Sequence, residues 1–224
     1  MSRATLLILA DGRFPAGGHA HSGGMEAAIA RGAIRDADCL QTFCQGRLHT
    51  TGLVAAALAA ATAAGTDPLA LDEAADARTP VRALRDIARK QGRQMMRAAR
   101  AVWPAPELDK LARDRPQGTH QPVVLGLAAR VAGLTSLDAA YAAAYESISG
   151  PATAAVRLLG LDPFEATAVL VRLADDLDQV ADRAARVADR VADEGTTVLP
   201  ANSAPLLDVT AAQHAQWPVR LFAS

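Results

Sequence analysis

Helical periodicity runs through almost the whole chain and most strongly limits what the chain can fold into. Apolar residues recur three or four positions apart in segment after segment, and the alternation typical of strands is almost absent. Half of the 224 residues are hydrophobic, but alanine, leucine and valine dominate, and aromatic residues make up only 4%. Such small side chains favour closely packed helices. The sequence therefore predicts an all-α, single-domain bundle of about eight to ten helices with an extended C-terminal tail.

Caps and breaks give the expected helix boundaries. Asp36 is an N-cap candidate, and Thr79-Pro80 places proline in the first turn of a long helix. Gly160 is an expected C-terminal cap, whereas Ser149-Gly-Pro151 should kink or divide the helix that contains it. The segments expected to be helical are 3–10, 23–31, 36–49, 52–64, 79–102, 107–114, 121–133, 136–159 and 163–193.

The last part of the chain differs from the rest. From residue 196 onward the helical periodicity is lost and prolines interrupt the sequence, yet many residues remain apolar. An apolar segment broken by prolines needs a surface to lie on, either its own domain or another protein. We therefore expect an all-helical domain over residues 1–195 and a separate C-terminal tail over residues 196–224.

The charge balance and the length of the apolar runs restrict partners and compartment. With 23 basic and 24 acidic residues the net charge is −1, which argues against nucleic acid as a partner. No apolar run reaches the ~18 residues of a membrane span, and the run Leu6 to Ala10 is too short for a secretory signal. Cys39 and Cys44 have no further cysteines to complete a disulfide framework and are expected to be buried free thiols. We expect a cytoplasmic protein with no membrane partner.

Residues 11–26 interrupt the helical pattern with glycines, a proline and polar side chains. Gly17 and Gly18, with two more glycines at 23 and 24, permit left-handed backbone or the close approach of another chain, and Ser22 is a helix-cap candidate. The segment does not fit a phosphate-binding loop, because it contains no lysine and follows a helix instead of a strand. We interpret it as a recognition loop.

Two histidines of this loop, His19 and His21, leave a metal site open as an alternative. With Glu26 or a distant histidine they would form a nitrogen-rich site. Two histidines at this spacing without a second pair are more often polar loop residues than metal ligands. No metal and no other cofactor is assigned.

Charged and apolar stripes mark two of the expected helices. One face of the helix over 79–102 carries Arg82, Arg85, Arg89, Arg93, Arg97 and Arg100. This stripe is either a solvated face or a surface for an acidic protein, and aspartates between 175 and 193 offer a possible intramolecular match. The apolar seam from Leu173 to Val191 is either core or an interface. No arrangement typical of a catalytic site is present, so we expect a binding protein and not an enzyme.

Three segments resemble the urease accessory protein UreF family, in an order and spacing that fit over nearly the whole chain. The loop from Asp11 to Glu26 is similar to the family's run hydrophobic-Pro-x-Gly-Gly-aromatic-x-x-Ser-x-Gly-hydrophobic-Glu. The other two segments are His120 with the following helix and Ala154-Ala-Val-Arg-Leu158, and then Ser203-Ala-Pro to His214 with Arg220-Leu-Phe-Ala-Ser224. The departures from the family pattern are His19 for an aromatic residue, Met25 for leucine, and Ser149-Gly-Pro151 for an Asn-Gln pair.

The resemblance implies an all-helical protein without catalytic activity that acts in nickel delivery to apo-urease. Members of the family bind the accessory protein UreD, also called UreH, and recruit and modulate the GTPase UreG, commonly as a homodimer within the complex. The family's tail becomes ordered against UreD/UreH, which assigns partner binding to Arg220, Leu221, Phe222 and Ser224. We further hypothesise that the face used with the GTPase includes Gly17, Gly18, Ser22 and Glu26.

Two other functions remain open for the same residues. One is a nickel-binding metallochaperone that uses His19 and His21. The other is a GTPase-activating protein that supplies an arginine, such as Arg157 or one from the basic stripe, to the active site of its partner.

Overall fold

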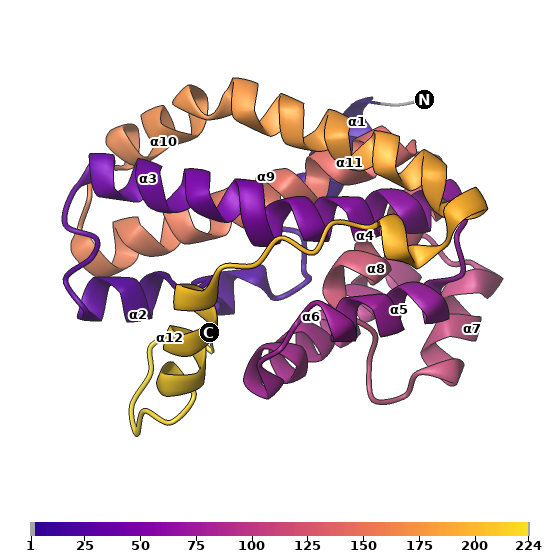
Figure 1. Ribbon diagram of the computed structural model, residues 1–224, viewed down its shortest axis with the longest axis horizontal. Helices are drawn as coiled ribbons and strands as arrows, with labels where there is room; N and C mark the ends of the chain where they lie inside the picture. Colours follow the sequence, from indigo (N-terminus) through magenta and orange to yellow (C-terminus); the bar gives the residue numbers. More distant parts are fainter. Residues whose placement is uncertain (1–2, 224) are drawn as a thin grey trace.

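The structure, a computed structural model, describes residues 3–223, and in this range it contains helices and connecting turns without a strand (Figure 1). No helix within this range is both long and apolar enough to cross a membrane. The α-helices are α1 (Arg3–Ala10), α2 (Met25–Ala30), α3 (Ala37–Arg47), α4 (Leu53–Ala64), α5 (Pro68–Ala77), α6 (Arg82–Val102), α7 (Pro106–Asp114), α8 (Gln121–Val131), α9 (Ser136–Leu159), α10 (Pro163–Arg172), α11 (Ala174–Glu194) and α12 (Pro205–His214).

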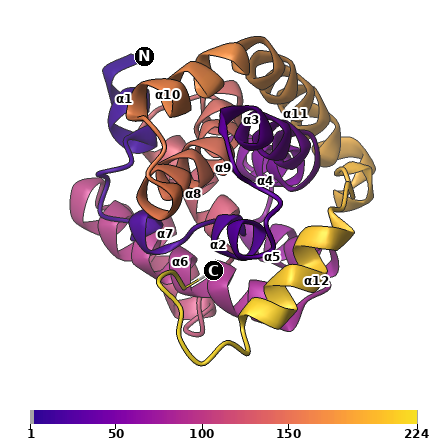
Figure 2. The same ribbon diagram turned by 90° about the vertical axis from the view of Figure 1, so that its left-hand side faces the viewer.

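The alanine-rich helix α4 lies at the centre of the bundle, where it contacts α8, α9 and α11 (Figure 2). Eight of its 12 residues are buried, and most of these are alanines. A Cβ atom at Gly126 of α8 would lie only 2.2 Å from the carbonyl oxygen of Ala59, so the two helix backbones touch. The expectation of closely packed helices with small side chains is confirmed.

Three differences from the expected boundaries, at α5, at α10 and α11, and at α12, raise the number of helices in the described range above eight to ten. Helix α5 begins at Pro68, where the segment 65–68 that we expected to be a connector ends, and it fills residues for which we predicted no helix. The segment expected as one helix over 163–193 is two, because the chain breaks at the buried Leu173 between α10 and α11. The apolar seam of α11 faces α4 and α9, with Val180, Ala184 and Val191 buried, and is therefore core.

Helix α9 continues through Pro151, which we expected to kink or divide it. Proline has no N–H to donate to the carbonyl oxygen four residues earlier. That oxygen, on Ser147, accepts a hydrogen bond from Nε of Arg47 in α3 at 2.9 Å. The side chain of a neighbouring helix thus replaces the missing backbone bond, and Pro151 itself is buried.

The tail is not extended throughout, which corrects our expectation for residues 196–224. A short 3₁₀ turn, Thr196–Val198, is followed by an irregular stretch and by α12, which contacts α2 and α6 of the same chain. The guanidinium of Arg78 at the end of α5 holds the start of the tail. It donates to the carbonyl oxygens of Thr196, Leu199 and Pro200 at 2.9 to 3.0 Å. The tail therefore lies on its own helical domain.

Candidate protein-interaction site

The backbone of the loop over residues 11–26 needs its glycines for two different reasons. Gly17, Gly23 and Gly24 have positive φ angles, which disfavour any residue with a side chain. A Cβ atom at Gly17 would also lie 1.9 Å from Oε1 of Gln94 in α6, so the close approach at this glycine is to the chain itself. Gly18 has no such restriction, because the nearest atom to its Cβ position is 3.8 Å away.

Glu26, in the first turn of α2, ties this loop to the C-terminal segment. Its Oε1 accepts the backbone N–H of Leu221 at 2.8 Å, and its Oε2 accepts the N–H of Phe222 at 3.0 Å. Nε2 of His214 lies 2.9 Å from Oε2. Ser22 is buried, and its hydroxyl accepts the N–H of Glu26 at 3.3 Å, but the N-cap of α2 is Gly24 and not Ser22. One carboxylate therefore joins α2, α12 and the last residues of the tail.

The hydrogen bonds of Glu26 determine its charge. Burial by itself favours the neutral acid and raises the pKa of Glu26, whereas the donors from Leu221, His214 and Phe222 favour the carboxylate. The donors prevail, and the pKa of Glu26 lies below its ordinary value. The tail is therefore held by an ionised group.

Arg157 of α9 holds the same region from the other side. Its guanidinium carbon lies 4.9 Å from the centroid of the Phe222 ring, within the range of a cation–π contact, and Nη1 donates to the carbonyl oxygen of His19 at 3.2 Å. The N–H of Ala223 donates to the carbonyl oxygen of Ala20 at 2.8 Å. We treated the loop and the tail as two contact regions, but in this structure they form one.

The remaining sequence-predicted residues lie around this joint. Arg220 is exposed, and no hydrogen bond or ion pair of its side chain occurs within residues 3–223. Ser224 lies outside the described residues. His19 is exposed, whereas His21 is buried, and burial, then Lys90 and His19, lower the pKa of His21 to about 4. In the described part of the chain no three His, Cys, Asp or Glu side chains group as metal ligands.

Apolar side chains stand exposed along the tail although the tail lies on the domain. Phe222 is buried, but Leu221 beside it is 75% exposed and Val219 is 79% exposed. Leu206 and Val209 of α12 are exposed as well. Exposed apolar residues that gather on one segment mark a surface for a protein partner. We define the tail–loop surface as the four exposed residues Leu206, Val209, Val219 and Leu221 together with Arg157, Arg220 and residues 17–20.

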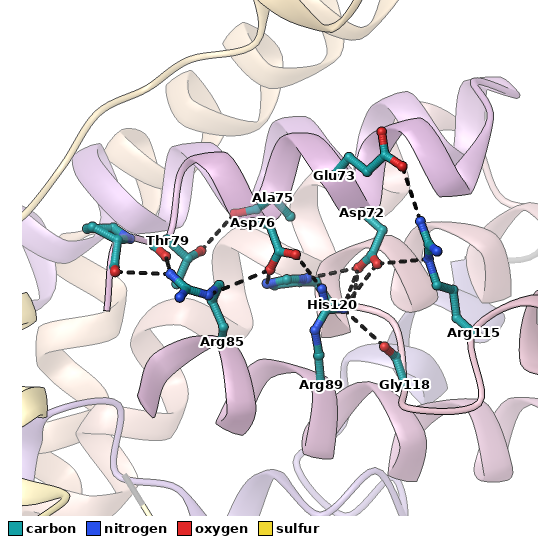
Figure 3. A network of polar contacts seen from close by, with 11 residues as sticks. Asp72, Glu73, Ala75, Asp76, Thr79, Arg85, Arg89, Arg115, Gly118 and His120 are labelled. Atoms are coloured by element: carbon teal, nitrogen blue, oxygen red, sulfur yellow. Dashed lines mark hydrogen bonds and ion pairs between the residues drawn. The ribbon is translucent and has the colours of Figure 1, made fainter. Parts of the chain in front are cut away.

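A second cluster of polar residues, which the sequence analysis missed, lies at α5 (Figure 3). The buried carboxylate of Asp72 accepts the backbone N–H of His120 at 2.9 Å and lies 2.8 Å from Nδ1 of the same residue. Arg89 of α6 reaches Asp72 at 3.0 Å and Asp76 at 2.5 Å. Nε of Arg115 lies 3.4 Å from Asp72. We call these five residues the Asp72 cluster.

The charges of the Asp72 cluster stabilise one another. Burial raises the pKa of Asp72, but the hydrogen bonds from His120 and Arg89 outweigh it and lower that pKa to about 2. Because Asp72, Arg89 and His120 belong to α5, α6 and the start of α8, the cluster ties together three segments of the domain. Its side chains point toward one another (Figure 3).

Some arginines of the α6 stripe thus form ion pairs within the chain. The sequence suggested the aspartates of α11 as the acidic partners of this stripe. No ion pair joins α6 to α11 within residues 3–223, so these aspartates are not its partners. Arg89 and Arg85 pair with α5, and Arg100 pairs with Asp109 of α7 at 2.6 Å. Arg97 remains exposed.

Comparison with known proteins identifies the class of protein to which this helical chain belongs. The UreF family model matches residues 34–174. A urease accessory protein UreF from a Mycobacterium species (strain JLS) is 43% identical over 221 residues, which cover 98% of each chain. The proteins of the same name from Mycolicibacterium vanbaalenii and Mycobacterium tuberculosis are 41% and 40% identical, each over 100% of this chain and 99% of the relative. The class is therefore that of the urease accessory proteins.

Within that class, the chain belongs to the UreF family. The family model does not extend to the loop over 11–26 or to the tail, but the full-length relatives cover both. The expectation drawn from three short segments of the sequence is confirmed at the level of the family.

Proposed function

We propose that this chain is a non-catalytic scaffold of urease maturation. In this role it binds a UreD/UreH-like protein, recruits and modulates a UreG-like GTPase, and brings both to apo-urease in the cytoplasm for nickel insertion. The observation that carries the proposal is the tail–loop surface, where one carboxylate and one arginine hold an apolar, largely exposed tail on the domain. A homodimer within the complex is part of the same proposal.

The tail is the expected site for the UreD/UreH-like partner. Val219 and Leu221 present apolar side chains to solvent while the neighbouring Phe222 is anchored in the domain. An anchored segment loses less conformational entropy on binding than a free one, so its exposed side chains contribute more to affinity. Arg220 stands between the two exposed residues and supplies a charge for recognition.

Co-expression tests this assignment. The chain is expressed with UreD/UreH-like and UreG-like proteins from one genome, and the mass of the purified assembly is measured. Val219→Asp with Leu221→Asp is expected to abolish capture of the UreD/UreH-like protein. The matched control Val171→Asp alters an apolar residue of α10 that is equally exposed and should leave capture unchanged. Equal capture by the tail variant and the unmodified chain would contradict the assignment.

The loop is the expected site for the GTPase. Gly18→Val is expected to leave the fold and the UreD/UreH-like partner in place, because Gly18 has ordinary backbone and free space, but to weaken recruitment of the GTPase. Gly17→Val serves as the contrast, since its side chain would collide with Gln94 and destabilise the fold itself. Recruitment of the GTPase by Gly18→Val at the level of the unmodified chain would rule out this role of the loop.

A further inference from the structure

A cavity of about 640 Å³ lies inside the domain beneath the loop over 11–26. Its wall includes side chains from α4, α6, α8, α9 and α12, and most of them are apolar. Polar side chains line part of it as well, and they determine which ligands the cavity can hold. Arg47, Thr51 and Glu146 are the three that matter here.

Arg47 carries a charge into this cavity. Its Nε is fixed by the carbonyl oxygen of Ser147, the one that Pro151 leaves without a backbone donor. The terminal nitrogens of the guanidinium line the cavity beside Gly23, and no carboxylate within residues 3–223 forms an ion pair with them. Burial lowers the pKa of Arg47, as expected for a cation without an acidic partner.

Thr51 adds an unsatisfied hydroxyl on the same side. It follows Arg47 by about one turn, in a π-helical turn over Leu48–Gly52 that joins α3 to α4. Turns of this kind are frequent at functional sites. The Oγ1 atom of Thr51 is buried and has no hydrogen-bond partner in the described structure. A buried hydroxyl of this kind costs free energy unless a ligand or water satisfies it.

Glu146 of α9 completes the polar part of the wall. Burial raises its pKa, and the hydrogen bond from Gln121 at 2.7 Å does not compensate for that effect. This direction favours the neutral acid over the carboxylate. The cavity thus offers two donors, the guanidinium of Arg47 and the hydroxyl of Thr51, and the carboxyl group of Glu146 also lines its wall.

We propose that this cavity binds a small oxyanion of the carboxylate, bicarbonate or phosphate type, with Arg47 and Thr51 as its main donors. A planar guanidinium forms two parallel hydrogen bonds with the oxygens of such an ion. The same oxygens could come from an acidic side chain of a bound protein. The occupant is the free ion, because Gly23 of the recognition loop lies directly against the guanidinium of Arg47. The proposal does not depend on the proposed partners of the tail–loop surface.

The test measures anion binding to the purified full chain. Acetate, bicarbonate and phosphate are titrated separately at constant ionic strength, and binding is followed by calorimetry and by the rise in the unfolding temperature. The unmodified chain is expected to bind at least one of these ions in a saturable way. Arg47→Gln should weaken binding about tenfold to a hundredfold, the usual cost of a lost charge-assisted hydrogen bond.

Two further variants separate binding from folding. Thr51→Val removes a hydroxyl without an internal partner, so it should leave the unfolding temperature without anion unchanged or higher while weakening the anion affinity. Arg97→Gln, an exposed arginine outside the cavity, should bind anions as the unmodified chain does. The proposal is overturned if none of the three ions shows saturable binding to the unmodified chain. It is also overturned if Thr51→Val binds the anion as tightly as the unmodified chain. Binding of a short glutamate-containing peptide but of no free ion would overturn it as well.

Discussion

Asp72 and Glu26 are two buried carboxylates with similar hydrogen bonds and different consequences for the molecule. Each accepts backbone N–H groups and lies next to a histidine ring nitrogen. Asp72 has, in addition, Arg89 and Arg115 within 3.4 Å, whereas none of the ion pairs of Glu26 in the described structure involves an arginine. Buried ion pairs with several partners are costly to break. Asp72 therefore fixes the fold, and Glu26 holds a segment that can be released.

The position of the partners along the chain strengthens this contrast. The partners of Asp72 belong to helices of the domain and the turns between them, so losing it loosens the domain itself. The partners of Glu26 are His214 and the last described residues of the tail, nearly 200 positions away. We expect their release to remove Phe222 from the edge of the core and to leave the helices of the domain in place. The two sites show that burial alone does not distinguish a carboxylate that stabilises the fold from one that holds a segment of an interaction surface.

The largest expected effect follows from removing Asp72. Asp72→Ala leaves Arg89 and Arg115 without their main partner in a buried place and should lower the free energy of unfolding by about 3 to 5 kcal/mol. Urea unfolding followed by circular dichroism measures the change. Glu73→Ala, which removes the exposed neighbour that also pairs with Arg115, should change it by less than about 0.5 kcal/mol. Similar losses in both variants would show that Asp72 does not fix the fold.

The unfolding free energy measured at decreasing pH should show the contribution of the same carboxylate, and the effect should be smaller than that of Asp72→Ala. The pKa of Asp72 is about 2 in the fold and 3.8 ordinarily, so its contribution is present above about pH 4 and is lost as the pH falls toward 2. This pKa shift corresponds to a contribution of about 2 kcal/mol to the free energy of unfolding near neutral pH. The gap in unfolding free energy between the unmodified chain and Asp72→Asn should therefore be constant near neutral pH and shrink between about pH 4 and pH 2. A gap that stays constant down to pH 2 would contradict the assignment.

Glu26→Gln should have the smallest effect on stability and a clear effect on the tail. The substitution weakens charge-assisted hydrogen bonds to Leu221 and Phe222 and should cost about 1 kcal/mol. Hydrogen exchange at these two amides should become several-fold faster, while exchange in α4 stays unchanged. Glu165→Gln, an exposed acid in the first turn of α10, is the matched control. Slow exchange of the tail amides in Glu26→Gln would show that Glu26 does not hold the tail.

The fold could be predicted from periodicity, but the contacts between distant segments could not. The Asp36 cap, the boundaries of α7 and the small-residue core all follow from local signals. Helix α5 had such a signal too, because Asp67-Pro68 places a cap before proline, and its side chain does accept the N–H of Leu69. We interpreted residues 65–68 as a connector and predicted no helix after them, so the Asp72 cluster was missed.

The tail–loop surface shows where the sequence reaches its limit. Glu26, Leu221, Phe222 and Arg157 were each named from the sequence, through the family resemblance or as an arginine candidate. That they meet could not be derived, since no periodicity relates residues almost 200 positions apart. The continuity of α9 through Pro151 was equally hidden, because Arg47 from another helix supplies the missing donor. Contacts of this kind appear only once the helices are placed in space.

The central proposal is that the loop and the tail are held together as one surface, on which the tail contacts the UreD/UreH-like partner and the loop contacts the GTPase. Hydrogen exchange of the full chain, measured free and in the co-purified complex, tests it most directly. Joint protection of residues 17–24 and 219–223 on binding, with Glu26→Gln reducing the protection of both, is the result the account predicts. Protection of the tail alone, with the loop unchanged and the Glu26 variant binding normally, would contradict it.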